Sequence, residues 1–264
     1  TLNFHNHGYY KNDKITIQSI ARKQKGKPDG IRFWNADGRK KGEGYVQLPV
    51  YYLSLSRLSP IGETSKTSTH NINLTQEEID YCVRAYREIL SITSISGVPS
   101  LSVEKGTGKR VYSGINDGIH DIFTNSAGEG NISRIILSIL SFKRLKDQYS
   151  TKYKGGILLI DELDATLYGF SQKRLLKYLL DSAKEYRIQI IFTTHSPIVL
   201  NEMYKLHREE SKRSGILPTQ SAYDTSIVYL SPDYKDDGSR MIKAENISTS
   251  TRLRLGPLRI VPRK

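Results

Sequence analysis

The chain has 264 residues, no apolar run long enough to cross a membrane, and one cysteine, Cys82. This length allows one large domain or two small ones, and the sequence excludes a membrane span and an internal disulfide framework. The first eight residues lack a signal-peptide pattern, so we expect a protein of the reducing cytoplasm with no membrane partner. Cys82 falls on the apolar side of a helical pattern and is expected in the core.

The net charge is +13, from 40 Lys and Arg against 27 Asp and Glu. Residues 1–48 hold ten basic and four acidic residues, and residues 238–264 hold seven and one, so the two ends together carry +12. Basic ends of this kind favour a polyanion such as nucleic acid as a partner. Solvated loops that only keep the protein soluble are the alternative.

Residues 9–55 have the pattern of short strands separated by turns. Lys14–Arg22 alternates apolar and polar side chains, and Ile31–Asn35 follows a turn rich in Gly and Pro, so we expect an antiparallel meander. Val46–Leu55 is a further strand, in which Pro49 confines the start to an edge or an entry position.

Three helices are predicted from apolar spacing and end signals. Thr75 and Glu78 form a capping box at the start of the first helix. The second helix follows a small polar loop, Asn125–Gly130, and the third covers about Ser171–Tyr186. A glycine-containing loop ahead of a helix is a plausible phosphate docking point, although an ordinary helix cap looks similar.

Gly108-Lys109 superficially resembles a phosphate-binding loop. The phosphate-loop pattern requires a glycine five residues earlier and Ser or Thr after the lysine, but Val103 and Arg110 occupy those positions. The flanking segments read as strands, so we predict a hairpin here and reject the phosphate loop.

A βαβ unit is predicted around residues 157–194. Ile157–Ile160 is an uninterrupted apolar run, which is typical of a parallel strand buried on both faces. Ile188–Thr194 is a second such strand, and the helix between them makes the two strands parallel. Asp161 and Glu162 end the first strand and His195 follows the second. A further helix near Ile198–Leu206 and two strands, Ser226–Leu230 and Met241–Ile247, complete the predicted elements.

The residues at the ends of these strands suit phosphoryl transfer to water. Open α/β sheets bind ligands at the carboxyl ends of their strands. Asp161 is placed to hold Mg²⁺, Glu162 to polarise the attacking water, and His195 to donate a hydrogen bond to a γ-phosphate. A strand with a solvated acidic turn and a structural histidine is the alternative.

The ordered motifs resemble a known family. Ile157–Glu162 resembles a Walker B motif with its catalytic glutamate, and Asp164–Leu167 resembles a D-loop. Thr194–Ser196 is similar to a switch-histidine loop. Asn125–Glu129 is similar to the signature loop of ABC-type ATPases, in the SMC-like and OLD-like branches of the AAA-family ATPases. At a finer level, three segments are most similar to Septu PtuA-type ATPases of bacterial antiphage defence, some of them retron-associated: Asn125–Glu129, Tyr52–Glu63 and Ser141–Leu145.

This resemblance implies an α/β fold with an ABC-ATPase-like mixed or parallel sheet, flanking helices and an antiparallel β meander at the N-terminal side. It implies ATP and Mg²⁺ as cofactors and an active head-to-tail dimer or higher oligomer. Asp161 would hold the metal, Glu162 and His195 would be catalytic, and residues of the signature and D-loop would contact nucleotide on a second subunit: Asn125, Ser126, Ala127, Gly128, Glu129 and Asp164. The implied protein partner is an HNH nuclease of PtuB type. Nucleic acid, which includes retron RNA or DNA, is the other implied partner.

The family's Walker A motif does not occur in the 264 residues. That motif precedes the others in the family, so either the sequence begins partway through the protein or the chain lacks its own phosphate loop. The incomplete set of strands favours the first alternative, and we expect the motif upstream of Thr1. The implied organisation is an antiparallel β part of the nucleotide-binding domain over 1–48, an ABC-type core over 49–230 and a basic segment over 231–264.

Two other functions remain open from the sequence. One is a nucleotide-gated scaffold that hydrolyses little and holds or inhibits a nuclease or nucleic acid. The other is an OLD-like repair nuclease, for which Asp233, Asp236 and Asp237 are the late acidic cluster. These three aspartates lack a preceding Glu-Gly strand motif, so we expect a solvated turn there.

Overall fold

The structure is a computed structural model. It describes residues 2–5, 14–22, 30–35, 48–58, 67–69, 73–92, 95, 97–98, 100–105, 108–114, 116, 126–214, 225–234 and 240–246. Within these ranges, no helix combines the length and the apolar character that crossing a bilayer requires.

A parallel three-stranded sheet lies at the centre of the structure. It contains β4 (Val50–Leu53), β8 (Gly156–Ile160) and β9 (Ile188–Phe192) in the order β4-β8-β9. Both pairings are parallel; the βαβ pattern predicts this for β8 and β9, whereas the parallel pairing of β4 with β8 was not predicted. Pro49 directly precedes β4, which is an edge strand among the described residues. The fold is therefore a mixed α/β one, as predicted.

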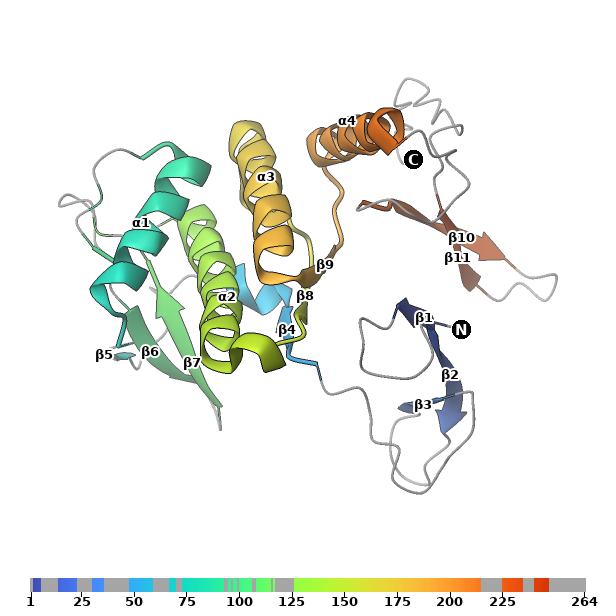
Figure 1. Ribbon diagram of the computed structural model, residues 1–264, viewed down its shortest axis with the longest axis horizontal. Coiled ribbons are helices and arrows are strands. Elements are labelled where there is room, and N and C mark those ends of the chain that lie inside the picture. Colours follow the sequence, from blue (N-terminus) through green and yellow to red (C-terminus); the bar gives the residue numbers. More distant parts are fainter. Residues whose placement is uncertain are drawn as a thin grey trace, which may run out of the picture.

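Two helices pack against this sheet, and a third packs against those two helices (Figure 1). The first two are α2 (Ala127–Tyr149) and α3 (Gly169–Tyr186), the third is α1 (Gln76–Leu90), and α4 (Pro197–Ser214) follows β9. Their inward side chains form one apolar core. Cys82 of α1 is fully buried in that core, as predicted, and burial raises the pKa of its thiol to about 12. A thiol with so high a pKa carries little thiolate at neutral pH.

The central sheet is covered on one face. Leu158 and Ile160 are 0% and 2% exposed and belong to the core. The alternate side chains of β8 are half-buried, and on the same side Val50, Tyr52 and Ile191 are 57%, 61% and 49% exposed. The prediction that the central strand is buried on both faces was therefore wrong for one face. An apolar run alone does not show which side the helices cover.

The remaining strands form antiparallel sheets. The first sheet contains β1 (Leu2–His5), β2 (Lys14–Arg22) and β3 (Gly30–Asn35). The antiparallel pairing of β2 with β3 confirms that part of the predicted meander, whereas β1 was not predicted. The second contains β5 (Thr67–Thr69), β6 (Ser100–Lys105) and β7 (Gly108–Ser113). The third pairs β10 (Val228–Tyr234) with β11 (Arg240–Asn246). Outside the sheets, the described residues also form two short 3-10 helices, η1 (Leu55–Leu58) and η3 (Ser150–Lys152).

Two segments that the sequence predicted as loops or turns contain residues that lie in strands of these sheets. Gly108 and Lys109 begin β7 and pair with the end of β6, so they open a strand and not the helix that a phosphate loop requires. Asp233 lies in β10 opposite Met241, so the prediction of a turn was wrong at this residue. Asp236 and Asp237 lie outside the described residues.

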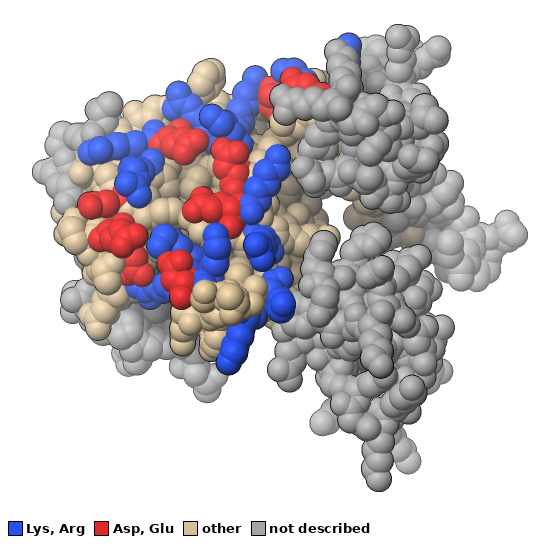
Figure 2. All heavy atoms as spheres, viewed as in Figure 1, with Lys and Arg blue, Asp and Glu red and all other residues tan. Residues whose placement is uncertain are grey.

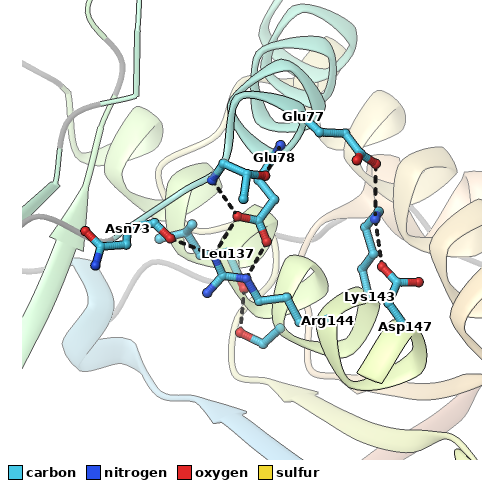
Figure 3. Close-up of polar contacts among 9 residues, drawn as sticks. Asn73, Glu77, Glu78, Leu137, Lys143, Arg144 and Asp147 are labelled. Carbon is cyan, nitrogen blue, oxygen red and sulfur yellow. Dashed lines mark hydrogen bonds and ion pairs between the residues drawn. The ribbon is translucent and has the colours of Figure 1, made fainter. Parts of the chain in front are cut away.

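A polar clamp joins the start of α1 to the end of α2 (Figure 3). The predicted capping box is present, with Glu78 accepting from the Thr75 N–H at 2.9 Å. Arg144 donates to Glu78 at 2.7 Å, and this hydrogen bond is the main reason that the pKa of Glu78 falls to about 2. Beside it, Lys143 lies 3.6 Å from Glu77.

Charged side chains of both signs are interspersed on the face that carries these helices (Figure 2). Lys and Arg do not form one continuous patch on the described part of this face. The predicted basic surfaces belong to residues 1–48 and 238–264, whose side chains lie mostly outside the described residues.

Candidate functional site

The carboxyl ends of β8 and β9 bring three polar residues together. The hydroxyl of Thr193, directly after β9, donates to Asp161 Oδ1 at 2.8 Å and accepts from the Glu162 N–H at 2.7 Å. Thr193 also continues the ladder, because its N–H donates to the carbonyl of Ile160 at 3.0 Å. Asp161 and Glu162 are thus fixed against the loop that carries His195, at the sheet edge that the sequence predicts.

Glu162 has an unusual backbone conformation. Its φ is 48°, in the left-handed region, where a residue with a side chain costs of order 1–3 kcal/mol and which is enriched at functional sites. Its carbonyl accepts from the Ala165 N–H at 3.1 Å and from Arg57 Nη2 at 2.8 Å. These hydrogen bonds, together with the one that the Glu162 N–H donates to the Thr193 hydroxyl, offset the strain and fix where the side chain of Glu162 starts.

Asp164 holds the loop after β9 in place. Its Oδ1 accepts one hydrogen bond from the Thr194 hydroxyl and a second one from the His195 N–H at 3.3 Å. The side chain of His195 is exposed. The structure thus joins Asp164 to the backbone of His195 and leaves the imidazole of His195 facing solvent.

A second polar bridge joins the end of the 164–167 segment to the start of α4. The Ser196 hydroxyl donates to Gln172 Oε1 at 2.6 Å, and Gln172 Nε2 donates to the carbonyl of Leu167 at 2.8 Å. Both side chains are buried. Ser196 Oγ also accepts from the N–H groups of Ile198 and Val199, so it caps α4. The segment 164–167 is therefore anchored at both ends.

The start of α2 differs from the prediction. Ser126 is the N-cap and forms a capping box with Glu129, with bonds of 2.6 and 3.2 Å. The prediction of a loop over Asn125–Gly130 was therefore wrong for Ala127–Gly130, which form the first helical turn. The Ser-x-x-Glu spacing was the signal that could have shown this. Asn125 lies outside the described residues.

Gly128 lets α2 approach the segment after β8. A Cβ added at Gly128 would lie 2.7 Å from the carbonyl oxygen of Thr166, a contact that real Cβ atoms do not make. At Gly130 an added Cβ would meet no atom within 4 Å. Close packing explains the first glycine and not the second. Ser126–Glu129 therefore lies directly against the 164–167 turn of the same chain.

Sequence reasoning missed two buried polar residues that join these parts. Arg57 of η1 is 3% exposed and Asn131 of α2 is 0% exposed. Arg57 Nε donates to Asn131 Oδ1 at 2.7 Å, and Asn131 Nδ2 donates to the carbonyl of Ala165 at 2.9 Å. Burial lowers the pKa of the Arg57 guanidinium from its ordinary value, and the nearby Asp161 opposes that shift. The one sequence signal was the presence of Arg57 in the family-like segment Tyr52–Glu63.

The residues present fit a magnesium ion that arrives with a nucleotide. Mg²⁺ is usually bound by one or two carboxylates together with phosphate oxygens and waters. Asp161 follows a rigid strand and is oriented by Thr193, so it meets that requirement. Within the described ranges, no three His, Cys, Asp or Glu side chains gather as a ready-made metal site.

Comparison with known proteins assigns the chain to a family. Residues 46–200 match the model of the AAA ATPase domain. One solved structure similar to the chain comes from work on the structural biochemistry of ATP-driven dimerization and DNA-stimulated activation of SMC ATPases. That similarity covers 65% of this chain and 86% of the other, at 17% identity and a TM-score of 0.34. The family match spans more than half of the 264 residues and includes β4, α2, β8, α3 and β9, so the chain belongs to the AAA ATPase domain family.

Proposed function

We propose that this chain is an ATP-binding and ATP-hydrolysing subunit of the ABC type, in which two copies assemble head to tail around nucleotide. One observation carries the proposal: Glu162 follows Asp161 at the carboxyl end of the central parallel strand, in a left-handed conformation fixed by three hydrogen bonds. Ligands of open α/β sheets bind at this edge.

The proposed roles follow from the chemistry of each side chain. Asp161 would hold Mg²⁺, which when bound neutralises charge on the phosphates. Glu162 accepts a proton from the attacking water, or orients that water, through its carboxylate. His195, whose imidazole is exposed, donates a hydrogen bond to the γ-phosphate. Asp164 keeps the loop of His195 in position through Thr194.

The contribution of the second copy is proposed from the start of α2. The first turn of a helix presents backbone N–H groups and a positive dipole end to an anion. Ser126 is exposed there, and Ser126, Ala127 and Gly128 would contact the γ-phosphate held by the other copy. Asn125 and Glu129 flank this contact, and the Glu129 carboxylate supports it through the capping box. The resemblance of this segment to a signature loop supports the arrangement.

Mixing two inactive variants tests the shared site. Ser126→Arg blocks the α2 terminus and Glu162→Gln removes the carboxylate, so each alone loses turnover. A heterodimer carries both defects in one composite site and none in the other, so an equal mixture should recover up to about a quarter of the wild-type rate. Gly130→Ala is the control, because it lies in the same part of α2 and an added Cβ there meets no atom within 4 Å. A mixture as inactive as its components, from variants shown to form mixed dimers, contradicts the head-to-tail arrangement.

At a finer level, we propose that the chain belongs to a Septu-type antiphage complex with an HNH nuclease partner. Three segments support this: Tyr52–Glu63, Asn125–Glu129 and Ser141–Leu145. Co-expression with a Septu-type HNH nuclease should give a complex that co-purifies and protects cells from phage. Protection should be lost in Glu162→Gln. Failure to co-purify contradicts the partner and leaves the ATPase proposal standing.

A further inference from the structure

We infer that Arg57 and Asn131 are positioning residues that connect the start of α2 to the backbone of Glu162 within one subunit. This inference rests on the proposed function, because it assigns the pair a role in hydrolysis at Glu162. The pair would link the two nucleotide sites of a dimer: each subunit offers α2 to one site and Glu162 to the other.

Arg57 uses its guanidinium to join three parts of the chain. Nε donates to Asn131 at 2.7 Å, and Nη2 donates to the carbonyl of Glu162 at 2.8 Å. Nη1 donates to the carbonyls of Leu53 at 3.3 Å and Ser54 at 3.1 Å. All three nitrogens are thereby engaged. The planar fork of arginine can reach these acceptors together, whereas a lysine ammonium is a single point on a flexible stem.

Asn131 completes the connection from the side of α2. Its Oδ1 accepts from Arg57 while its Nδ2 donates to the carbonyl of Ala165. The Ala165 N–H in turn donates to the carbonyl of Glu162. The four residues form a closed circuit of hydrogen bonds. Through this circuit α2 is joined to the turn after β8 directly at Ala165 and, by way of Arg57, at Glu162.

Burial makes this circuit stiff. Arg57 and Asn131 are 3% and 0% exposed, so water cannot readily replace a broken hydrogen bond, and an unpaired group there is costly. Gly128 lies against Thr166 one helical turn from Asn131. A shift of the first turn of α2 would therefore displace the 164–167 turn through the Gly128 contact and would also displace Asn131. Both displacements end at the peptide group of Glu162.

Matched variants on α2 separate positioning from general stability. Asn131→Ala removes both contacts. Asn131→Asp keeps an acceptor for Arg57 and cannot donate to Ala165. Ser133→Ala is the control, because Ser133 is also 0% exposed on the same helix and bonds the Tyr86 hydroxyl, outside the circuit.

ATP turnover of the full chain, with nucleotide affinity measured separately, is the first measurement. Asn131→Ala should lower kcat at least about tenfold with KM within about twofold of wild type, because binding groups are untouched. Asn131→Asp should fall between, and Ser133→Ala should keep the wild-type kcat. Hydrogen exchange gives a readout independent of activity: amides 162–167 should exchange faster in Asn131→Ala than in Ser133→Ala.

The outcomes are distinguishable. If Glu162→Gln slows turnover and Asn131→Ala does not, the positioning role is overturned while the proposed function stands. If Asn131→Ala and Ser133→Ala lose turnover and protection equally, the circuit is only structural and the inference is again overturned. If wild type hydrolyses ATP no faster than Glu162→Gln, the proposed function fails, and the inference about hydrolysis fails with it.

Discussion

Gly128 and Thr166 touch across 38 positions of sequence: a Cβ on the glycine would lie 2.7 Å from the threonine carbonyl oxygen. This contact presses the start of α2 against the turn that follows Asp161 and Glu162. A backbone oxygen cannot move aside as a side-chain end can, so any residue larger than glycine must displace the turn.

Gly128→Ala should therefore lower ATP turnover at least about tenfold and destabilise the fold by about 1–3 kcal/mol, because overpacking forces the backbone to shift. Gly130→Ala is the matched control two residues later. An added Cβ there meets no atom within 4 Å, and alanine in place of a helical glycine stabilises by about 0.5–1 kcal/mol. Turnover and urea unfolding of both variants check this. Equal turnover in the two would show that the contact does not matter for catalysis.

Asp164→Ala should free the loop of His195. The variant loses the acceptor of two hydrogen bonds, from the Thr194 hydroxyl and the His195 N–H, which we expect to cost about 1–3 kcal/mol of stability. Turnover should fall at least about tenfold because the imidazole of His195 is no longer placed. Asp164→Asn is the control, since its amide oxygen can accept in place of Oδ1. Wild-type turnover in Asp164→Ala would rule out this role.

Glu78 should make stability depend on pH in the acid range. Its pKa in the folded protein is about 2 against an ordinary value of 4.5, so the unfolded chain takes up its proton first as pH falls. The contribution is complete above about pH 4.5 and is lost as pH falls toward 2. After allowance for solvent screening we expect about 1–2 kcal/mol.

Urea unfolding of wild type and Glu78→Gln at pH 6 and near pH 2.5 measures this contribution, because glutamine keeps the capping box without the charge. The difference between the two proteins should be large at pH 6 and small at the lower pH. Glu77→Gln is the control, since the Glu77 side chain is 80% exposed and should contribute little. A Glu78 contribution that is unchanged between the two pH values would contradict the lowered pKa of Glu78 in the folded protein.

Local pattern was sufficient to predict the centre of the fold. The apolar run Ile157–Ile160 and the helical stripe of α3 belong to the same βαβ unit, and β8, α3 and β9 begin and end within about two residues of their expected bounds. The end signals of α1 are equally local, because Thr75 and Glu78 are three residues apart. Such features depend on neighbours in the chain, which the sequence displays directly.

The features that the sequence did not predict depend on distant partners. Burial of Arg57 requires acceptors on Asn131 and Glu162, 74 and 105 positions away, and no local pattern shows that they will meet. The half-buried side of β8 depends on where the helices pack. The carboxylates were predicted as chemical groups, whereas the hydroxyls of Thr193 and Thr194 that orient Asp161 and Asp164 were not, since threonine after a strand is unremarkable in sequence.

ATP turnover and ATP binding, measured side by side in wild type and Glu162→Gln with Mg²⁺ present, test directly whether Glu162 drives hydrolysis. Glutamine has nearly the same shape as glutamate and cannot take a proton from water. We expect Glu162→Gln to bind ATP as tightly as wild type and to hydrolyse it at least about tenfold more slowly. Wild-type turnover in this variant would contradict the catalytic role of Glu162.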